Sequence, residues 1–102
     1  MEGMELISFQ IISAVGSAKS FYMEAIAAAK TGDFAKAEEL MSEGQTVFLE
    51  GHKAHAQLIQ NEATGEKIEF SLLFMHAEDQ LMSTDLLKLM ALEIIELHKK
   101  IA

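Results

Sequence analysis

Two glycine-centred breaks divide this sequence into three long stretches, and this division constrains the fold more than any other feature. The first break is centred on Gly32, and the second covers residues 61–67 around Gly65. Glycine suits the position just after a helix ends, and Asp33 suits the N-cap of a helix that follows. Because the chain contains no proline, nothing inside the three stretches forces a helix to stop.

Apolar residues recur at helical spacing in each stretch and predict three helices. The predicted helices run from Met4 to Lys30, from 34 to 62 and from 69 to 101. The apolar stripes of the first two contain Met4, Ile11, Val15, Ala18, Tyr22, Ala25 and Ala29, and then Ala37, Leu40, Met41, Val47, Phe48, Ala54 and Leu58. Short connections make consecutive helices antiparallel neighbours. We therefore predict one all-α domain over residues 1–102, an antiparallel up-down-up three-helix bundle.

Three glycines inside the predicted helices suggest close helix packing. Gly44 and Gly51 lie on the apolar face of the second helix, and Gly16 lies in the middle of the first. A glycine inside a helix costs up to about 1 kcal/mol relative to alanine. We therefore expect all three to allow a neighbouring helix to approach closely.

The acidic composition excludes several classes of function. The chain has 16 acidic residues and eight basic ones, all lysine, for a net charge of −8. Nucleic-acid binding requires a basic stripe, and an anionic membrane surface would repel this chain. The run from Leu72 to Met75 is far too short to span a bilayer, and the N-terminus lacks the basic region of a signal peptide. We expect a cytoplasmic protein that inserts into no membrane, with an acidic surface suited to a basic partner.

The third helix has more uncharged surface than two sister helices can cover. Of the 28 residues from Phe70 to Leu97, 17 are apolar. On a wheel of 100° per residue, every charge in this stretch except Asp79 falls within one sector, Glu78 included. An apolar surface this wide requires burial on several sides. We infer that the third helix also contacts copies of itself or another partner.

A polar stripe interrupts the apolar seam of this helix. His76, Asp79, Gln80 and Ser83 follow the spacing i, i+3, i+4, i+7 and therefore share one face. A buried Asp79 would need a cation, a hydrogen-bond donor or a metal, because an unpaired carboxylate is costly to bury. The pattern leaves two interpretations open for His76. It is either a hydrogen-bonded core residue or part of a functional site.

The other histidines form no complete site in the sequence. His52 and His55 are three residues apart, which supplies only half of a metal site. A ferritin-type metal centre needs Glu-x-x-His pairs, and no histidine here has a glutamate three residues before it. His98 belongs to the last helical turn, where a histidine favours the negative end of the helix dipole.

An ordered set of short motifs resembles one known family. The motifs are GSAKS at 16–20, AAKTGDFAKA at 28–37, His52, GEK at 65–67, HAEDQLMST at 76–84 and IEL at 95–97. They resemble the enzyme IIA component of the lactose/cellobiose (chitobiose) class of the sugar phosphotransferase system, over nearly the whole chain.

The resemblance implies a homotrimer of three-helix protomers with His76 as the phosphorylated residue. Asp79 would match the aspartate that, with its two symmetry mates, holds a divalent cation on the threefold axis. Mg²⁺ suits such a ligand set, because hard cations prefer oxygen ligands. His76 would accept a phosphoryl group from the general carrier HPr and pass it to a cysteine of a IIB component, for uptake of a β-glucoside, lactose or cellobiose type of sugar.

The chain departs from the family pattern His-x-Gln-Asp-His-Leu-Met-Thr at two positions. Glu78 replaces the glutamine, and Gln80 replaces the second histidine, while His55 stands where glutamine is common. An amide at position 80 can donate a hydrogen bond to the phosphoryl group, but it cannot carry a positive charge. These departures support an alternative hypothesis, in which the chain is a regulatory or scaffold trimer that has lost phosphoryl transfer.

Overall fold

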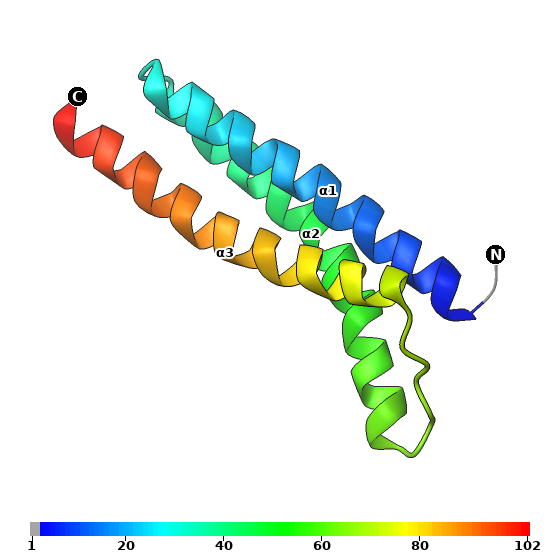
Figure 1. Cartoon of the computed structure of the whole chain (residues 1–102). Coiled ribbons are helices and arrows are strands. Elements are labelled where there is room, and N and C mark those ends of the chain that lie inside the picture. The colour runs from blue at the N-terminus through cyan, green and yellow to red at the C-terminus, as the bar shows by residue number, and fades with distance from the viewer. Residues whose placement is uncertain (1–2) are drawn as a thin grey trace.

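The computed structural model describes residues 3–102, which form three α-helices and no strand. Helix α1 is Gly3–Lys30, α2 is Phe34–Ala63 and α3 is Leu72–Ile101. The chain runs up α1, down α2 and up α3 (Figure 1). The predicted all-α, up-down-up arrangement is therefore confirmed. None of the helices within residues 3–102 is long and apolar enough to cross a membrane.

The two predicted breaks contain residues that end one helix or cap the next. Gly32 and Gly65 adopt φ angles of +82° and +100°, a region that glycine enters without steric cost. The Asp33 side chain caps α2 by accepting a hydrogen bond from the Lys36 N–H at 3.1 Å. One boundary differs from the prediction. Helix α3 begins at Leu72 rather than at residue 69, because Ser71 is an extended N-cap residue.

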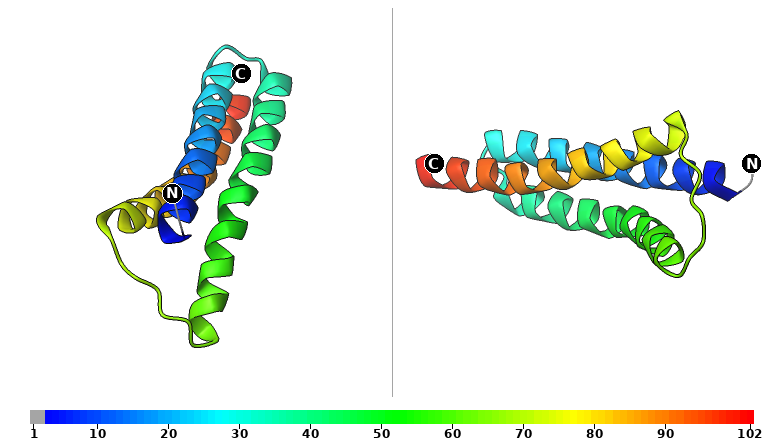
Figure 2. Two further views of the ribbon diagram at one scale, coloured as in Figure 1. Left: turned by 90° about the vertical axis from the view of Figure 1, so that its right-hand side faces the viewer. Right: turned by 60° about the horizontal axis from the view of Figure 1, so that its bottom comes forward.

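Helix α1 is the centre of the fold, because both other helices pack mainly against it. Helices α2 and α3 contact each other much less than either contacts α1. The C-terminal turns of α2 diverge from α1 and α3, and the linker of residues 64–71 returns to the start of α3 (Figures 1 and 2). The result is an elongated protomer of 52 × 24 × 20 Å.

The predicted close packing of helices occurs at two of the three glycines. A Cβ atom built on Gly44 would lie 2.6 Å from Cε1 of Tyr22, and one on Gly51 would lie 3.1 Å from Cγ1 of Val15. The prediction for Gly16 is wrong. That residue is exposed, and a Cβ atom there would meet nothing within 4 Å.

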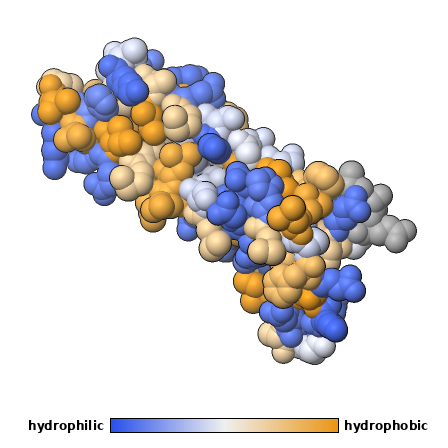
Figure 3. All heavy atoms as spheres, viewed as in Figure 1, coloured by the Kyte–Doolittle hydropathy of each residue, from blue (hydrophilic) through white to orange (hydrophobic). Residues whose placement is uncertain are grey.

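Helix α3 leaves a long apolar face uncovered, as its composition predicts. Its buried side chains, which face the core, are Phe74, Ala77, Leu81, Thr84, Ala91 and Ile95. Its exposed large apolar side chains are Leu72, Met75, Met82, Leu86, Leu89, Met90, Leu92, Leu97 and Ile101. Apolar patches are visible on the molecular surface in Figure 3. Monomeric proteins rarely expose so many apolar side chains along one element.

Candidate functional site

His76 lies in the second turn of α3, with its side chain exposed. The turn before it is well anchored, since the Phe74 N–H donates to Oγ of Ser71 at 3.1 Å and Phe74 is buried. Ala77, the next residue along the helix, is completely buried. The exposed position rules out a hydrogen-bonded core role for His76 within the protomer. A partner protein can reach its imidazole, while the helix beneath it is held in the core.

The polar stripe predicted for the apolar seam lies outside the protomer core. His76, Asp79 and Ser83 are exposed, and Gln80 is half-buried. The buried face of α3 is centred about 100° away from His76 around the helix axis, so Asp79 is not buried within the single chain. Its burial between copies of the chain stays a prediction. Within residues 3–102, no group of three or more histidine, cysteine or acidic side chains is placed to hold a metal. Within the described residues, a single protomer therefore does not supply a complete set of metal ligands around Asp79.

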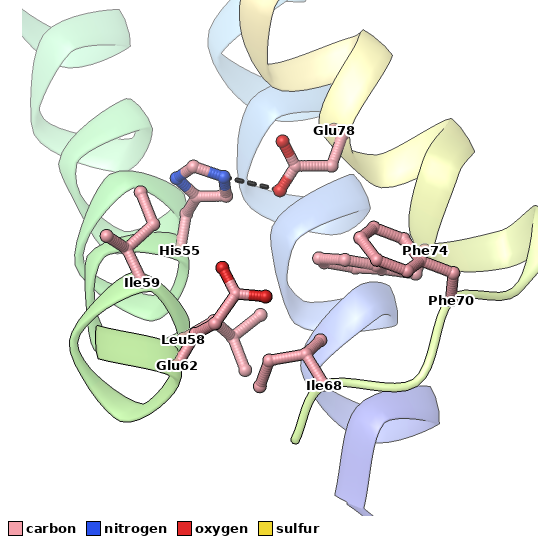
Figure 4. A pocket seen from close by; sticks show the side chains of 8 residues that line it. All are labelled: His55, Leu58, Ile59, Glu62, Ile68, Phe70, Phe74 and Glu78. Carbon is pink, nitrogen blue, oxygen red and sulfur yellow. Dashed lines mark ion pairs between the residues drawn. The ribbon is translucent and has the colours of Figure 1, made fainter. Parts of the chain in front are cut away.

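Glu78 is the site residue that the helical wheel placed wrongly. The wheel places it in the solvent sector, but it is half-buried and forms an ion pair with His55. Oε1 of the glutamate faces Nε2 of the imidazole (Figure 4). The pair joins α2 to α3, two helices that contact each other little. The wheel missed this contact because it gives the angle of Glu78 around α3, but not the position of α2.

A cavity of about 200 Å³ adjoins this ion pair. Leu58, Ile68 and Phe74 line it with apolar surface, and His55, Glu62 and Glu78 add polar groups (Figure 4). The remaining lining residues are Ile59 and Phe70. Glu78, which lines the cavity, projects about 200° away from His76 around the helix axis. The cavity therefore lies on the side of α3 opposite His76. It is therefore separate from the exposed histidine face.

The two remaining histidines belong to neither feature. His52 is exposed and stacks on Phe48, with ring centroids 6.4 Å apart. His98 is half-buried in the last turns of α3. His52 and His55 have different surroundings, one at the surface of α2 and the other facing Glu78.

Tyr22 forms a buried polar contact between helices that the sequence pattern did not reveal. Its hydroxyl donates to Oε1 of Gln45 at 3.4 Å, so it joins α1 to α2. Burial, assisted by the negative charge of Asp85 on α3, raises the pKa of Tyr22 to about 12. In the sequence Tyr22 is one member of an apolar stripe, and nothing local distinguishes it from a core residue without a polar partner.

Comparison with known proteins places this arrangement in a family. The family described as "PTS system, Lactose/Cellobiose specific IIA subunit" matches residues 6–99. The lichenan-specific phosphotransferase enzyme IIA component of Bacillus subtilis (strain 168) is 49% identical over 100 residues, covering 98% of this chain and 91% of the relative. The lactose-specific EIIA component of Staphylococcus aureus (strain N315) is 40% identical over 99 residues, covering 97% and 96%.

Solved structures show the same fold. The cellobiose-specific enzyme IIA from Bacillus anthracis superposes with a TM-score of 0.95 at 44% identity, covering 99% of this chain and 93% of the other. The second structure is the IIA(chitobiose)–HPr complex of the N,N'-diacetylchitobiose branch of the Escherichia coli phosphotransferase system. Its matching chain superposes with a TM-score of 0.83 at 32% identity, covering 99% of this chain and 98% of the other. The chain therefore belongs to the lactose/cellobiose-specific IIA family, and it is a phosphotransferase component of the sugar phosphotransferase system.

Proposed function

We propose that this protein carries a phosphoryl group on His76 between phospho-HPr and a IIB component. The observation that carries the proposal is the exposed imidazole of His76 on a helix that is anchored by the buried side chains beside it. The similarity to an IIA protein solved in complex with HPr supports HPr as the donor. The relatives point to sugars of the lactose, cellobiose and β-glucoside type.

The proposed reaction consists of two phosphoryl transfers. A neutral imidazole nitrogen of His76 attacks the phosphorus of phosphohistidine in HPr, forming one N–P bond while the other breaks and HPr leaves with a free imidazole. A cysteine thiolate of IIB then attacks the same phosphorus, forming an S–P bond and releasing His76. Such transfers depend mainly on positioning and on stabilising the charge of the phosphoryl oxygens.

Gln80 is the side chain of α3 best placed to assist this transfer. It lies one helical turn after His76, about 40° away around the helix axis, and it is half-buried. Its amide can donate a hydrogen bond to a phosphoryl oxygen. Because an amide is neutral, it stabilises the phosphoryl charge less than a cationic side chain at the same position would.

We also propose that the working unit is a homotrimer. The exposed apolar face of α3 supports this assembly, because association would remove that surface from water. Asp79 lies on the same face among exposed apolar side chains, including Met75 and Met82. A threefold axis along this face would bring three copies of Asp79 together.

A divalent cation, such as Mg²⁺, fits this proposed cluster of carboxylates. Three like charges in a dry interface repel one another, and oxygen ligands suit a hard cation. The cation would supply charge neutralisation to the interface, while His76 performs the transfer. With a net charge of −8 on each chain, encounters with a basic carrier surface in the cytoplasm would be fast and sensitive to salt.

Phosphorylation with purified components tests the proposal. The protein is incubated with enzyme I, HPr and phosphoenolpyruvate, and intact mass is measured for wild type, His76→Ala and His52→Ala. We expect wild type and His52→Ala to gain one phosphoryl group per chain and His76→Ala to gain none. An unlabelled wild type would instead favour the regulatory or scaffold trimer, and labelling of His76→Ala would move the site to another histidine.

A further inference from the structure

Two ion pairs connect α2 and α3, and they differ in their exposure to solvent. His55 pairs with Glu78 near the start of α3, and Nζ of Lys99 lies 3.0 Å from Oε1 of Glu38 near its end. The side chains of the first pair are 17% and 31% exposed, whereas those of the second are 37% and 70% exposed. Solvent and salt screen the second pair more strongly. The His55–Glu78 pair is therefore the link between the two helices that solvent screens less.

The less exposed pair joins α2 to the same turns of α3 that carry His76. Glu78 follows His76 by two residues, so the two side chains project about 200° apart, one toward α2 and the other toward the exposed face. Phe74 and Ala77 hold these turns in the core, which α3 shares mainly with α1. The helix is thus held from two directions, toward α1 by apolar contacts and toward α2 by the ion pair. Together these contacts oppose rotation of α3 about its own axis.

We propose that His55 and Glu78 are positioning residues for phosphoryl transfer at His76. This inference rests on the proposed function. A side chain about 5–6 Å from the helix axis moves by about 1 Å when the helix rotates by about 10°. A misplacement of this size can slow a reaction by as much as about a hundredfold. By opposing that rotation, the ion pair keeps the imidazole of His76 where an in-line transfer requires it.

The test compares two ways of breaking the pair with one way of replacing it. The variants Glu78→Ala and His55→Ala remove one partner, and the double variant His55→Gln/Glu78→Gln restores a neutral hydrogen-bonded link. Glu38→Gln is the matched control, because it removes the ion pair at the other end of the same two helices. Rapid-quench measurements of transfer from phospho-HPr give kcat and KM for each protein.

Positioning predicts a lower kcat with an almost unchanged KM. We expect each alanine variant to lose about three- to tenfold in kcat, because Phe74 and Ala77 still limit the rotation. The double glutamine variant should return to within about twofold of wild type, and Glu38→Gln should match wild type. Unchanged kcat in both alanine variants would overturn the inference, as would an equal loss in Glu38→Gln or a double variant as slow as the single ones.

A measurement without a phosphoryl donor separates this inference from the proposed function. The ring signals of His76 in NMR spectra, assigned with His76→Ala, should be narrow in wild type and broadened or split in Glu78→Ala. Identical ring signals in the two proteins would overturn positioning even if His76 is phosphorylated. Absence of labelling in wild type would overturn the carrier function, whereas the effect on the His76 ring would still be observed if the pair positions it.

Discussion

The ring of Tyr22 lies directly over the backbone of Gly44, where a Cβ atom would come within 2.6 Å of Cε1 and 2.8 Å of Cδ1. Tyr22 is completely buried, so its ring has little room to move aside. The same Cβ atom would also lie 3.1 Å from Cβ of Phe21. This contact sets how closely α1 and α2 approach each other.

Gly44→Ala should destabilise the protein even though alanine is the better helix former. Overpacking a core contact costs about 1–3 kcal/mol, while the gain in helix propensity is at most about 1 kcal/mol. Gly16→Ala is the matched control, because that glycine is exposed, helical and free of neighbours. Urea denaturation should show Gly44→Ala below wild type and Gly16→Ala slightly above it. An equal or higher stability of Gly44→Ala would show that α1 and α2 separate easily at this contact.

Tyr22 should ionise far above the ordinary range for a tyrosine. It is the single tyrosine of a chain without tryptophan, so absorbance at 295 nm reports its phenolate alone. Burial, and then the negative charge of Asp85, raise the pKa of Tyr22 from its ordinary value of 10.0 to about 12 in the folded protein. Alkaline titration should give a midpoint near 12 for the native protein and near 10 in denaturant. A native midpoint near 10 would contradict the burial of the hydroxyl.

The same shift predicts how stability depends on alkaline pH. The folded state holds the Tyr22 proton up to a higher pH than the unfolded state does, so the unfolded state loses its proton first. The contribution of the Tyr22 hydroxyl to the free energy of unfolding is complete below about pH 10, and it is lost as the pH rises toward 12. The melting temperature should therefore fall more steeply between pH 10 and 12 in wild type than in Tyr22→Phe. Parallel curves for the two proteins would rule out this linkage.

The exposed face of α3 should hold three chains together. Sedimentation equilibrium of wild type should give the trimer mass at micromolar concentrations. Leu86→Glu places a charge at a side chain that is 60% exposed in the protomer, so it should dissociate the trimer while leaving the helical content of the protomer nearly unchanged. A wild type that remains monomeric over this range would rule out the proposed assembly.

Chelation should destabilise the wild-type trimer if three Asp79 carboxylates share a cation. EDTA should lower the melting temperature of wild type, and elemental analysis should find a divalent metal. Asp79→Leu should melt identically with and without EDTA, and at or above the wild-type temperature, because apolar replacement of buried charges is often stabilising. Asp79→Asn removes the charge at nearly constant shape. Identical melting of wild type in both conditions, with no metal bound, would require another partner for Asp79.

The sequence alone determined the parts of this protein that depend on local chemistry. Glycine at 32 and 65, and Asp33 as a cap, mark where helices end, and the apolar spacing marks the helices themselves. The excess of apolar side chains in α3 predicted its uncovered face. The polar stripe and the family resemblance both point to His76, and the family is confirmed.

Only the tertiary structure decided which side of α3 faces which neighbour. A helical wheel fixes the angles between His76, Asp79 and Glu78, but it contains no information on where α1 and α2 lie. Because α3 packs mainly on α1, Asp79 is exposed in the protomer and Glu78 meets His55 of α2. The contacts of Tyr22 with Gly44 and Gln45 likewise join residues more than 20 positions apart. Such pairs depend on how whole helices pack, which no local pattern along the chain records.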